Sequence, residues 1–210
     1  MEFPARKIVE FYKNYGRTFP WRVQRTPFKV FVAEYMLVRT RADNVVSPYI
    51  RFISKYPSLE ALILGDRLKN DCIVAFSSLG LTRRATHFYR CLERFIEIGG
   101  VPREVEIIEG LPYVGQYIRA AIRIFGFGIK DAIIDANVVR VIARFHGIEI
   151  KDSLRRDSGF AELVRSSVPD YDFVDYSYGL IDFSSVVCRK TPLCDSCSLA
   201  SQCSSANSCE

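Results

Sequence analysis

Four closely spaced cysteines near the C-terminal end constrain the fold of this chain more than any other feature. Cys188, Cys194, Cys197 and Cys203 follow a C-x5-C-x2-C-x5-C pattern, interrupted by Pro192. A loop this short brings four thiolates to one point at a small cost in loop-closure entropy. Zinc and an iron–sulfur cluster both accept four thiolates, and a group of surface thiols is a third alternative. One C-x2-C pair flanked by wider steps favours a cluster over zinc, whose sites often contain two such pairs.

The other three of the seven cysteines follow no such pattern. Cys72 and Cys91 are isolated in apolar, helix-like sequence, which predicts buried and inert thiols, and Cys209 is left over. No basic run leads into an apolar run at the N-terminus, so we expect no secretory signal and no disulfide scaffold. No apolar stretch is long enough to span a membrane.

Hydrophobic periodicity predicts helices along nearly the whole chain. Apolar residues recur close to every 3.6 positions, whereas β-branched runs such as 131–134 are too short to build a sheet. A loop is expected over residues 16–27, which include the only tryptophan, Trp21. The sequence therefore predicts an all-α fold, with helices over residues 2–15, 28–41, 44–55, 58–64, 66–76, 83–98, 104–109, 116–125, 136–145, 157–167 and 172–187.

Glu34 is a lone acid inside an apolar helical stretch. It lies about one turn from both Phe31 and Val38, on a face rich in apolar side chains. Partial desolvation there would raise the pKa of its carboxyl group and suit it to proton transfer. The alternative is a glutamate at the helix edge that pairs with Lys29 or Arg39.

Asp135 is a second lone acid, directly before the helix expected from residue 136. An aspartate in that place is first of all an N-cap, and Val138 offers no capping-box partner. The capped N–H groups and the helix dipole keep such a carboxylate ionised, and in a cleft it can stabilise a developing cation. Capping and catalysis are therefore compatible at Asp135.

The segment Leu111-Pro-Tyr-Val-Gly115 separates two predicted helices. Pro112 and Gly115 favour a tight turn, after which free N–H groups of the second helix can face a phosphate oxygen. Arg119 and Arg123 add positive charge nearby, and the net charge of +5 is compatible with a nucleic-acid partner. A plain pair of helices joined by a turn is the alternative.

Together these motifs resemble the helix-hairpin-helix DNA glycosylases of the endonuclease III type. The resemblance covers almost the whole chain, through the order and spacing of Phe19-Pro20-Trp21-Arg22, residues 33–40, residues 78–81, the 111–115 hairpin, residues 134–141, Asp182-Phe-Ser and the terminal cysteines. It implies two helical lobes with the active cleft between them. One is a six-helix barrel-like lobe with the helix-hairpin-helix, residues 26–134; the other is a cluster lobe made of residues 1–25 and 135–210.

The resemblance also implies the cofactors of these lobes. The four thiolates of the C-x5-C-x2-C-x5-C segment would hold a 4Fe–4S cluster rather than zinc. In this family a monovalent cation often lies at the hairpin, bound by backbone carbonyl groups.

Tyr117, two residues after the hairpin glycine, separates the branches of this family. The lyase-competent branch has a lysine there that forms a Schiff base with the sugar, and a tyrosine cannot do so. Tyr117 with Glu34 and Asp135 is most similar to the archaeal thymine/uracil–guanine mismatch DNA glycosylases of base excision repair. The resemblance therefore implies a monofunctional enzyme that acts on mismatched double-stranded DNA in a prokaryotic cytoplasm, associated with the nucleoid. The sequence gives no sign of oligomerisation, so we expect a monomer, and we expect no membrane partner.

Two alternatives share these residues. One is an adenine DNA glycosylase that acts on adenine opposite guanine or 8-oxoguanine. Adenine glycosylases usually carry a further C-terminal domain, which we expect to be absent because only seven residues follow Cys203. The other alternative is a non-catalytic DNA-binding module of the same fold.

The resemblance implies roles for individual residues once the mispaired base has flipped out of the duplex. Asp135 would stabilise the oxocarbenium-like sugar or orient the attacking water, while Glu34 would hydrogen-bond or protonate the departing base and Tyr117 would line the pocket. Arg39 and Leu81 would fill the gap left in the duplex. Further DNA contacts are implied for Tyr113, Gly115, Arg189 and Lys190.

The sequence departs from the family pattern in three places. Tyr113 stands where a glycine is usual, the segment 80–85 is one residue shorter, and the first cysteine step is x5 rather than x6. His87 and His146 lie near no motif, so we expect them to be surface or structural residues.

Overall fold

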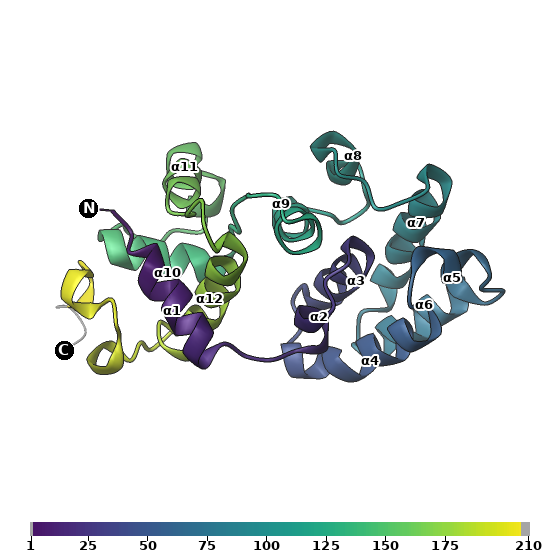
Figure 1. Cartoon of the computed structure of the whole chain (residues 1–210), viewed down its shortest axis with the longest axis horizontal. Coiled ribbons are helices and arrows are strands. Elements are labelled where there is room, and N and C mark those ends of the chain that lie inside the picture. The colour runs from purple at the N-terminus through teal and green to yellow at the C-terminus, as the bar shows by residue number, and fades with distance from the viewer. Residues whose placement is uncertain (1, 207–210) are drawn as a thin grey trace. The chain divides into compact units, whose positions relative to one another are not determined.

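The computed structural model describes residues 2–206, and within that range it contains helices and turns but no strand (Figure 1). The predicted all-α fold is confirmed. Cys209 lies outside the described residues. None of the helices in the described range is long and apolar enough to cross a membrane.

The chain forms two compact units. Unit 1 combines Met1–Arg17 with Lys130–Glu210, and unit 2 is Thr18–Ile129. Unit 1 is discontinuous because its first helix, α1 (Ala5–Tyr15), packs against its last, α12 (Phe173–Val186). Its other elements are α10 (Ala136–His146), α11 (Ser158–Ser166) and three short 3-10 turns, Leu154–Arg156, Cys194–Ser196 and Ala200–Gln202.

Unit 2 is built around the apolar helix α3. Eight of the eleven residues of α3 are buried, from Phe28 to Met36. The Phe31 ring stacks on Phe88 with centroids 5.6 Å apart and meets the edge of Phe95 at 4.7 Å. The helices of this unit are α2 (Pro20–Val23), α3 (Pro27–Leu37), α4 (Ala42–Lys55), α5 (Leu59–Ile63), α6 (Leu68–Ser77), α7 (Thr82–Ile98), α8 (Val105–Glu109) and α9 (Gln116–Ala121).

Two details of the helix prediction are wrong. The expected loop over residues 16–27 contains the short helix α2, in which Pro20 occupies the first turn and Trp21 is buried. The single helix expected over residues 116–125 is α-helical only to Ala121, and Ile122–Gly126 forms a π-helix. Hydrophobic spacing does not reveal such a wider turn. Gly126 lies so close to Pro27 that an added Cβ would be 2.9 Å from the Pro27 Cα atom, so this packing requires glycine.

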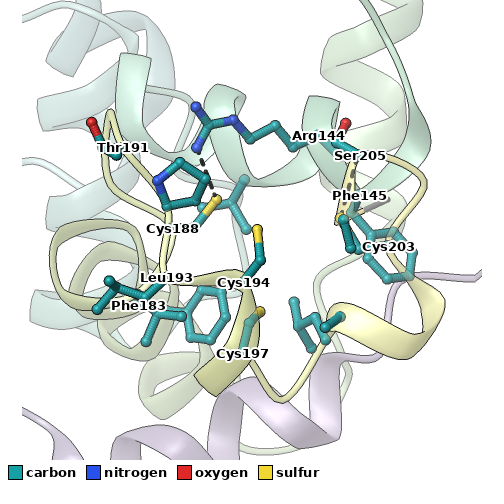
Figure 2. A pocket seen from close by; sticks show the side chains of 16 residues that line it. Arg144, Phe145, Phe183, Cys188, Thr191, Leu193, Cys194, Cys197, Cys203 and Ser205 are labelled. Carbon is teal, nitrogen blue, oxygen red and sulfur yellow. Dashed lines mark hydrogen bonds between the residues drawn. The ribbon is translucent and has the colours of Figure 1, made fainter. Parts of the chain in front are cut away.

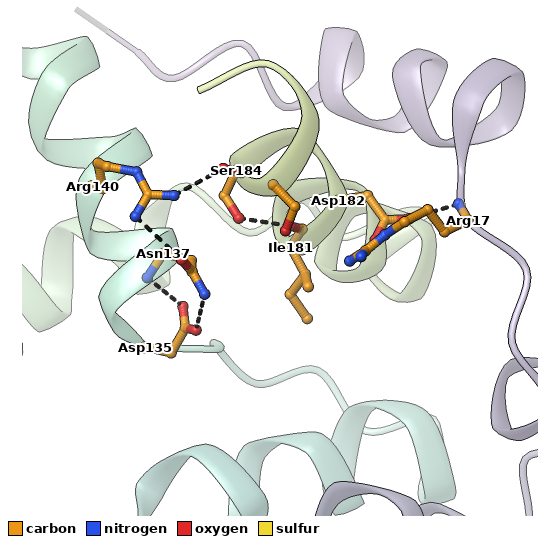
Figure 3. Close-up of polar contacts among 8 residues, drawn as sticks. Arg17, Asp135, Asn137, Arg140, Ile181, Asp182 and Ser184 are labelled. Atoms are coloured by element: carbon orange, nitrogen blue, oxygen red, sulfur yellow. Dashed lines mark hydrogen bonds and ion pairs between the residues drawn. The ribbon is translucent and has the colours of Figure 1, made fainter. Parts of the chain in front are cut away.

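An ion pair fixes the end of the N-terminal segment in unit 1 (Figure 3). Asp182 on α12 is completely buried, and its carboxylate accepts the Arg17 backbone N–H at 2.8 Å and Nε at 2.7 Å. Both oxygens of a buried carboxylate therefore have charge-assisted partners, which such a group needs.

Candidate functional site

Glu34 and Tyr117 meet inside unit 2. Glu34 lies on α3 and is only 3% exposed, and Tyr117 lies in the first turn of α9. The Tyr117 hydroxyl donates a hydrogen bond of 2.8 Å to Oε2 of Glu34. Because α3 is buried on almost all sides, Glu34 occupies the interior and not a helix edge, and Lys29 donates to the Gln24 side chain.

Asp135 is the N-cap of α10 in unit 1, as predicted. Its Oδ1 atom accepts the backbone N–H groups of Asn137 at 3.0 Å and Val138 at 2.7 Å. The second oxygen, Oδ2, accepts the Asn137 side-chain amide at 3.0 Å (Figure 3). Three donors therefore fix the orientation of this carboxylate.

A chain of hydrogen bonds continues from Asp135 to the first cysteine. Arg140 donates to Oδ1 of Asn137 at 3.2 Å and to the carbonyl oxygen of Ser184 at 2.8 Å (Figure 3). It also donates to the carbonyl oxygen of Cys188 at 2.8 Å. Sequence reasoning missed Asn137 and Arg140. Their spacing of three residues on a helix places them on one face, but their partners on α12 and beyond are distant in sequence.

The hairpin between α8 and α9 is held by a hydrogen bond from α3. The buried Tyr35 hydroxyl donates to the Pro112 carbonyl oxygen at 3.0 Å. Tyr113 has φ 59°, in the left-handed region, and its side chain is 65% exposed. Gly115 is the exposed N-cap of α9, and Arg119 pairs with Glu109 across the hairpin.

Arg39 and Leu81 differ in their surroundings. Arg39 follows the end of α3, is exposed and has φ 60°. Leu81 is the residue before α7, is half-buried and packs against the hydrophobic core of unit 2. Of the two residues expected to fill the duplex gap, Arg39 therefore has the freer side chain.

The four cysteines of the C-terminal motif line one pocket of about 420 Å³ in unit 1 (Figure 2). Apolar side chains, among them Phe145, Phe183 and Leu199, form the rest of its wall. Burial and the neighbouring thiols of Cys188 and Cys203 raise the pKa of Cys197. As placed between residues 2 and 206, no three His, Cys, Asp or Glu side chains are close enough together to hold a metal ion.

Arg144 ties the cysteine segment to α10. Its guanidinium donates to Sγ of Cys188 at 3.6 Å and to the carbonyl oxygens of Arg189 at 2.7 Å and Lys190 at 3.0 Å. Both Arg189 and Lys190 have exposed side chains. The backbone that carries these two cations is therefore held in place while their side chains face solvent.

Curated proteins of known activity match nearly the full chain, although no protein-family model does. The thymine/uracil-DNA glycosylase of Methanothermobacter thermautotrophicus is 33% identical over 206 residues, 96% of this chain and 92% of that protein. The thymine-DNA glycosylase of Aeropyrum pernix is 30% identical over 212 residues, 97% of this chain and 94% of that protein. An adenine DNA glycosylase of Buchnera aphidicola is 30% identical over 202 residues, which are 94% of this chain but 57% of that protein.

Solved structures share the fold. A non-covalent endonuclease III–DNA complex matches with a TM-score of 0.75 at 20% identity, over 97% of this chain and 94% of that one, which defines the fold as endonuclease III-like. A thermostable thymine-DNA glycosylase matches with a TM-score of 0.88 at 32% identity, over 98% and 95% of the two chains. The chain belongs to the DNA glycosylases and, among them, to the thymine/uracil-DNA glycosylases. The predicted family and enzyme class are confirmed.

Proposed function

We propose that this enzyme removes thymine or uracil mispaired with guanine in double-stranded DNA by hydrolysing the N-glycosidic bond. The observation that carries the proposal is the Tyr117–Glu34 hydrogen bond, in a chain that matches thymine/uracil-DNA glycosylases over most of their length. A tyrosine that is hydrogen-bonded to a buried carboxyl group can form part of the wall of a base-binding pocket. It offers no amine for a covalent intermediate with the sugar.

The reaction breaks the bond between C1′ and the base nitrogen, and the electron pair leaves with the base. We assign to Asp135, which the Asn137 amide and two backbone N–H groups hold, the stabilisation of the positive charge that develops on the sugar. A water oxygen bonds to C1′, and the water gives one proton to Asp135, which releases it to solvent. Glu34 supplies the proton or hydrogen bond that the departing base needs.

Strand cleavage is not part of this reaction. A lyase step begins with a Schiff base between an enzyme amine and the sugar C1′, and the Tyr117 hydroxyl cannot form one. The product is therefore an abasic site in an intact strand.

DNA is held through its backbone and through the gap left by the flipped base. Arg39 enters this gap, with Leu81 beside it, because an exposed cationic side chain can replace the lost stacking and contact the orphaned guanine. The hairpin around Tyr113 and Gly115 contacts phosphates of the same duplex. Exposed Arg189 and Lys190 add cations on unit 1, and one protein monomer binds one mismatch.

The four-cysteine pocket offers the donor set of a 4Fe–4S cluster, although its cysteines as placed do not converge on one metal ion. Four cysteines, which would bind iron as soft thiolates, line one apolar pocket, and the Arg144 guanidinium offers a positive charge and an N–H to the Cys188 sulfur. When bound, the cluster supplies iron–thiolate bonds that cross-link the segment from Cys188 to Cys203. Arg144 and Arg140 hold the carbonyls of this segment from α10.

A monovalent cation at the hairpin is also part of the proposal. The Tyr35 hydroxyl already occupies the Pro112 carbonyl oxygen, so the cation would use other carbonyl oxygens of the 111–115 segment.

Base release from four duplexes tests the proposed substrate. The protein is incubated with T·G, U·G, A·G and A·8-oxoguanine duplexes, abasic sites are cleaved with alkali, and a T·A duplex is the matched control. We expect scission of the T·G and U·G duplexes at the mispaired pyrimidine. Scission of the adenine-containing duplexes alone would establish the adenine alternative, which the 30% identity to an adenine DNA glycosylase favours. Absence of scission in every duplex would leave a non-catalytic DNA-binding module.

A further inference from the structure

Two exposed residues of unit 2 have a strained backbone. Arg39 has φ 60° and Tyr113 has φ 59°, and neither is a glycine or an asparagine. A left-handed conformation is unfavourable for such residues, because their Cβ atom crowds the backbone. Because both side chains face solvent, core burial does not offset this cost. Strain of this kind persists where the surrounding structure enforces it, which is common at functional sites.

One helix contacts both strained segments. Arg84 and His87 are three residues apart on α7 and therefore lie on the same face. The Arg84 guanidinium donates to the carbonyl oxygen of Val38, directly before Arg39. This contact fixes the peptide group between Val38 and Arg39, and with it the start of the left-handed turn at Arg39.

His87 supports Tyr113 from the same face of α7. The two rings have centroids 4.3 Å apart and an interplanar angle of 48°. The Nδ1 atom of His87 is enclosed and has no hydrogen-bond partner among the described residues, so ring packing sets the position of the imidazole. With one ring face against His87, the Tyr113 side chain is still 65% exposed.

We propose that Arg84 and His87 are positioning residues that hold Arg39 and Tyr113 as a paired contact to duplex DNA, with Tyr113 bound to the sugar-phosphate backbone. This inference rests on the proposed function, because it takes DNA as the partner. The Tyr113 hydroxyl donates a hydrogen bond to a phosphate oxygen, and the free ring face covers a deoxyribose. The aromatic side chain thereby supplies the DNA-backbone contact at this position of the hairpin.

Affinity for a non-hydrolysable substrate tests this arrangement. The probe is a T·G duplex whose thymidine carries a 2′-fluorine, which resists hydrolysis because fluorine disfavours positive charge at C1′. Fluorescence anisotropy gives Kd for wild type, Tyr113→Gly, His87→Ala and the double variant. We expect Tyr113→Gly to weaken binding roughly tenfold, the scale of losing one aromatic contact and its hydrogen bond. Its melting temperature stays within a few degrees, because glycine relieves the backbone strain while the variant loses the tilted ring contact with His87.

The double variant separates positioning from a general structural effect. His87→Ala alone should weaken binding about threefold to fivefold, and should add nothing in the Tyr113→Gly background if His87 acts only through Tyr113. Equal losses in both backgrounds, or wild-type affinity of Tyr113→Gly, would overturn the inference. Tyr171→Gly removes an exposed tyrosine from unit 1 and should keep wild-type affinity; a loss as large as that of Tyr113→Gly would also overturn it. The same cycle on Arg84 and Arg39 tests the second contact.

Single-turnover base release at saturating protein separates this inference from the proposed function. The wild type should release the mispaired pyrimidine, and Tyr171→Gly, which changes an exposed tyrosine of unit 1 without an assigned role, should release it at the wild-type rate. If the wild type releases the base but Tyr113→Gly binds the duplex with the same Kd as the wild type, the paired contact is overturned and the proposed function stands. If Tyr113→Gly has a higher Kd than the wild type but the wild type releases no pyrimidine, the paired contact is supported and the proposed function is overturned.

Discussion

The Tyr117 hydroxyl lies 2.8 Å from Oε2 of Glu34 and donates a hydrogen bond to it, although Glu34 is almost completely buried. This bond restricts the glutamate side chain to one orientation in an apolar environment. We propose that Tyr117, which offers no amine for a Schiff base, thereby serves to orient Glu34.

Tyr117→Phe tests that role. Removal of the hydroxyl leaves Glu34 with one donor fewer and a freer side chain, so we expect single-turnover base release from T·G duplexes to slow by about tenfold. The affinity for the 2′-fluoro duplex should not change. An unchanged rate would mean that the bond serves stability alone.

Tyr117→Lys introduces an amine at the place where lyase-competent relatives have one. We expect some strand cleavage and a protein–DNA adduct trapped by borohydride, because a lysine can form a Schiff base with C1′. The wild type should give no adduct under the same conditions. An adduct with the wild type would contradict the monofunctional reaction and point to another amine in the protein.

Asp135→Asn removes the negative charge but keeps a side-chain oxygen that can cap α10. We expect base release to fall by about 100-fold or more, the scale of losing one electrostatic stabiliser, while DNA affinity and the melting temperature stay close to wild type. Asn137→Ala is the companion variant, since it removes the third donor to the carboxylate and leaves both backbone donors. Near-normal turnover in Asp135→Asn would reduce Asp135 to a helix cap.

Metal content and thiol reactivity test the cysteine pocket together. Protein purified without oxygen should contain about four iron atoms per chain and be brown. After chelation, iodoacetamide should modify Cys188, Cys194, Cys197 and Cys203. Cys72 and Cys91 should stay unmodified near pH 8, because burial raises the pKa of Cys91 to about 12 and that of Cys72 further. A colourless protein with one zinc per chain would replace the cluster with a zinc site.

Asp182→Ala breaks the buried pair with Arg17. Loss of one partner leaves the Arg17 backbone N–H and guanidinium without their acceptor, so we expect the free energy of unfolding to fall by about 2 kcal/mol. This value allows for the third of the Arg17 side chain that reaches solvent. Urea denaturation measures it, and Asp170→Ala is the control because its ion pair with Lys130 is exposed and should contribute nothing measurable.

Local signals in the sequence predicted the helices and the cap at Asp135, because capping depends on residues two and three positions away. They also predicted that Glu34 lies on an apolar face, but not that Tyr117, distant in sequence, bonds to it. The π-helix after Ala121 was not predicted, because the spacing of apolar residues does not distinguish one widened turn from a regular α-helical turn. The contact between the His87 and Tyr113 rings was not predicted either, because Tyr113 belongs to a hairpin that is distant in sequence from α7.

The discontinuity of unit 1 has a consequence for synthesis on the ribosome. Helix α1 emerges first, but α12, against which it packs, is translated only after the whole of unit 2. At ordinary elongation rates, the apolar face of α1 around Ile8 and Val9 stays exposed for on the order of ten seconds before α12 is synthesised. Unit 2 is continuous and can fold during that interval. A chaperone that binds short amphipathic helices would therefore meet α1 during this interval, before α12 has been synthesised.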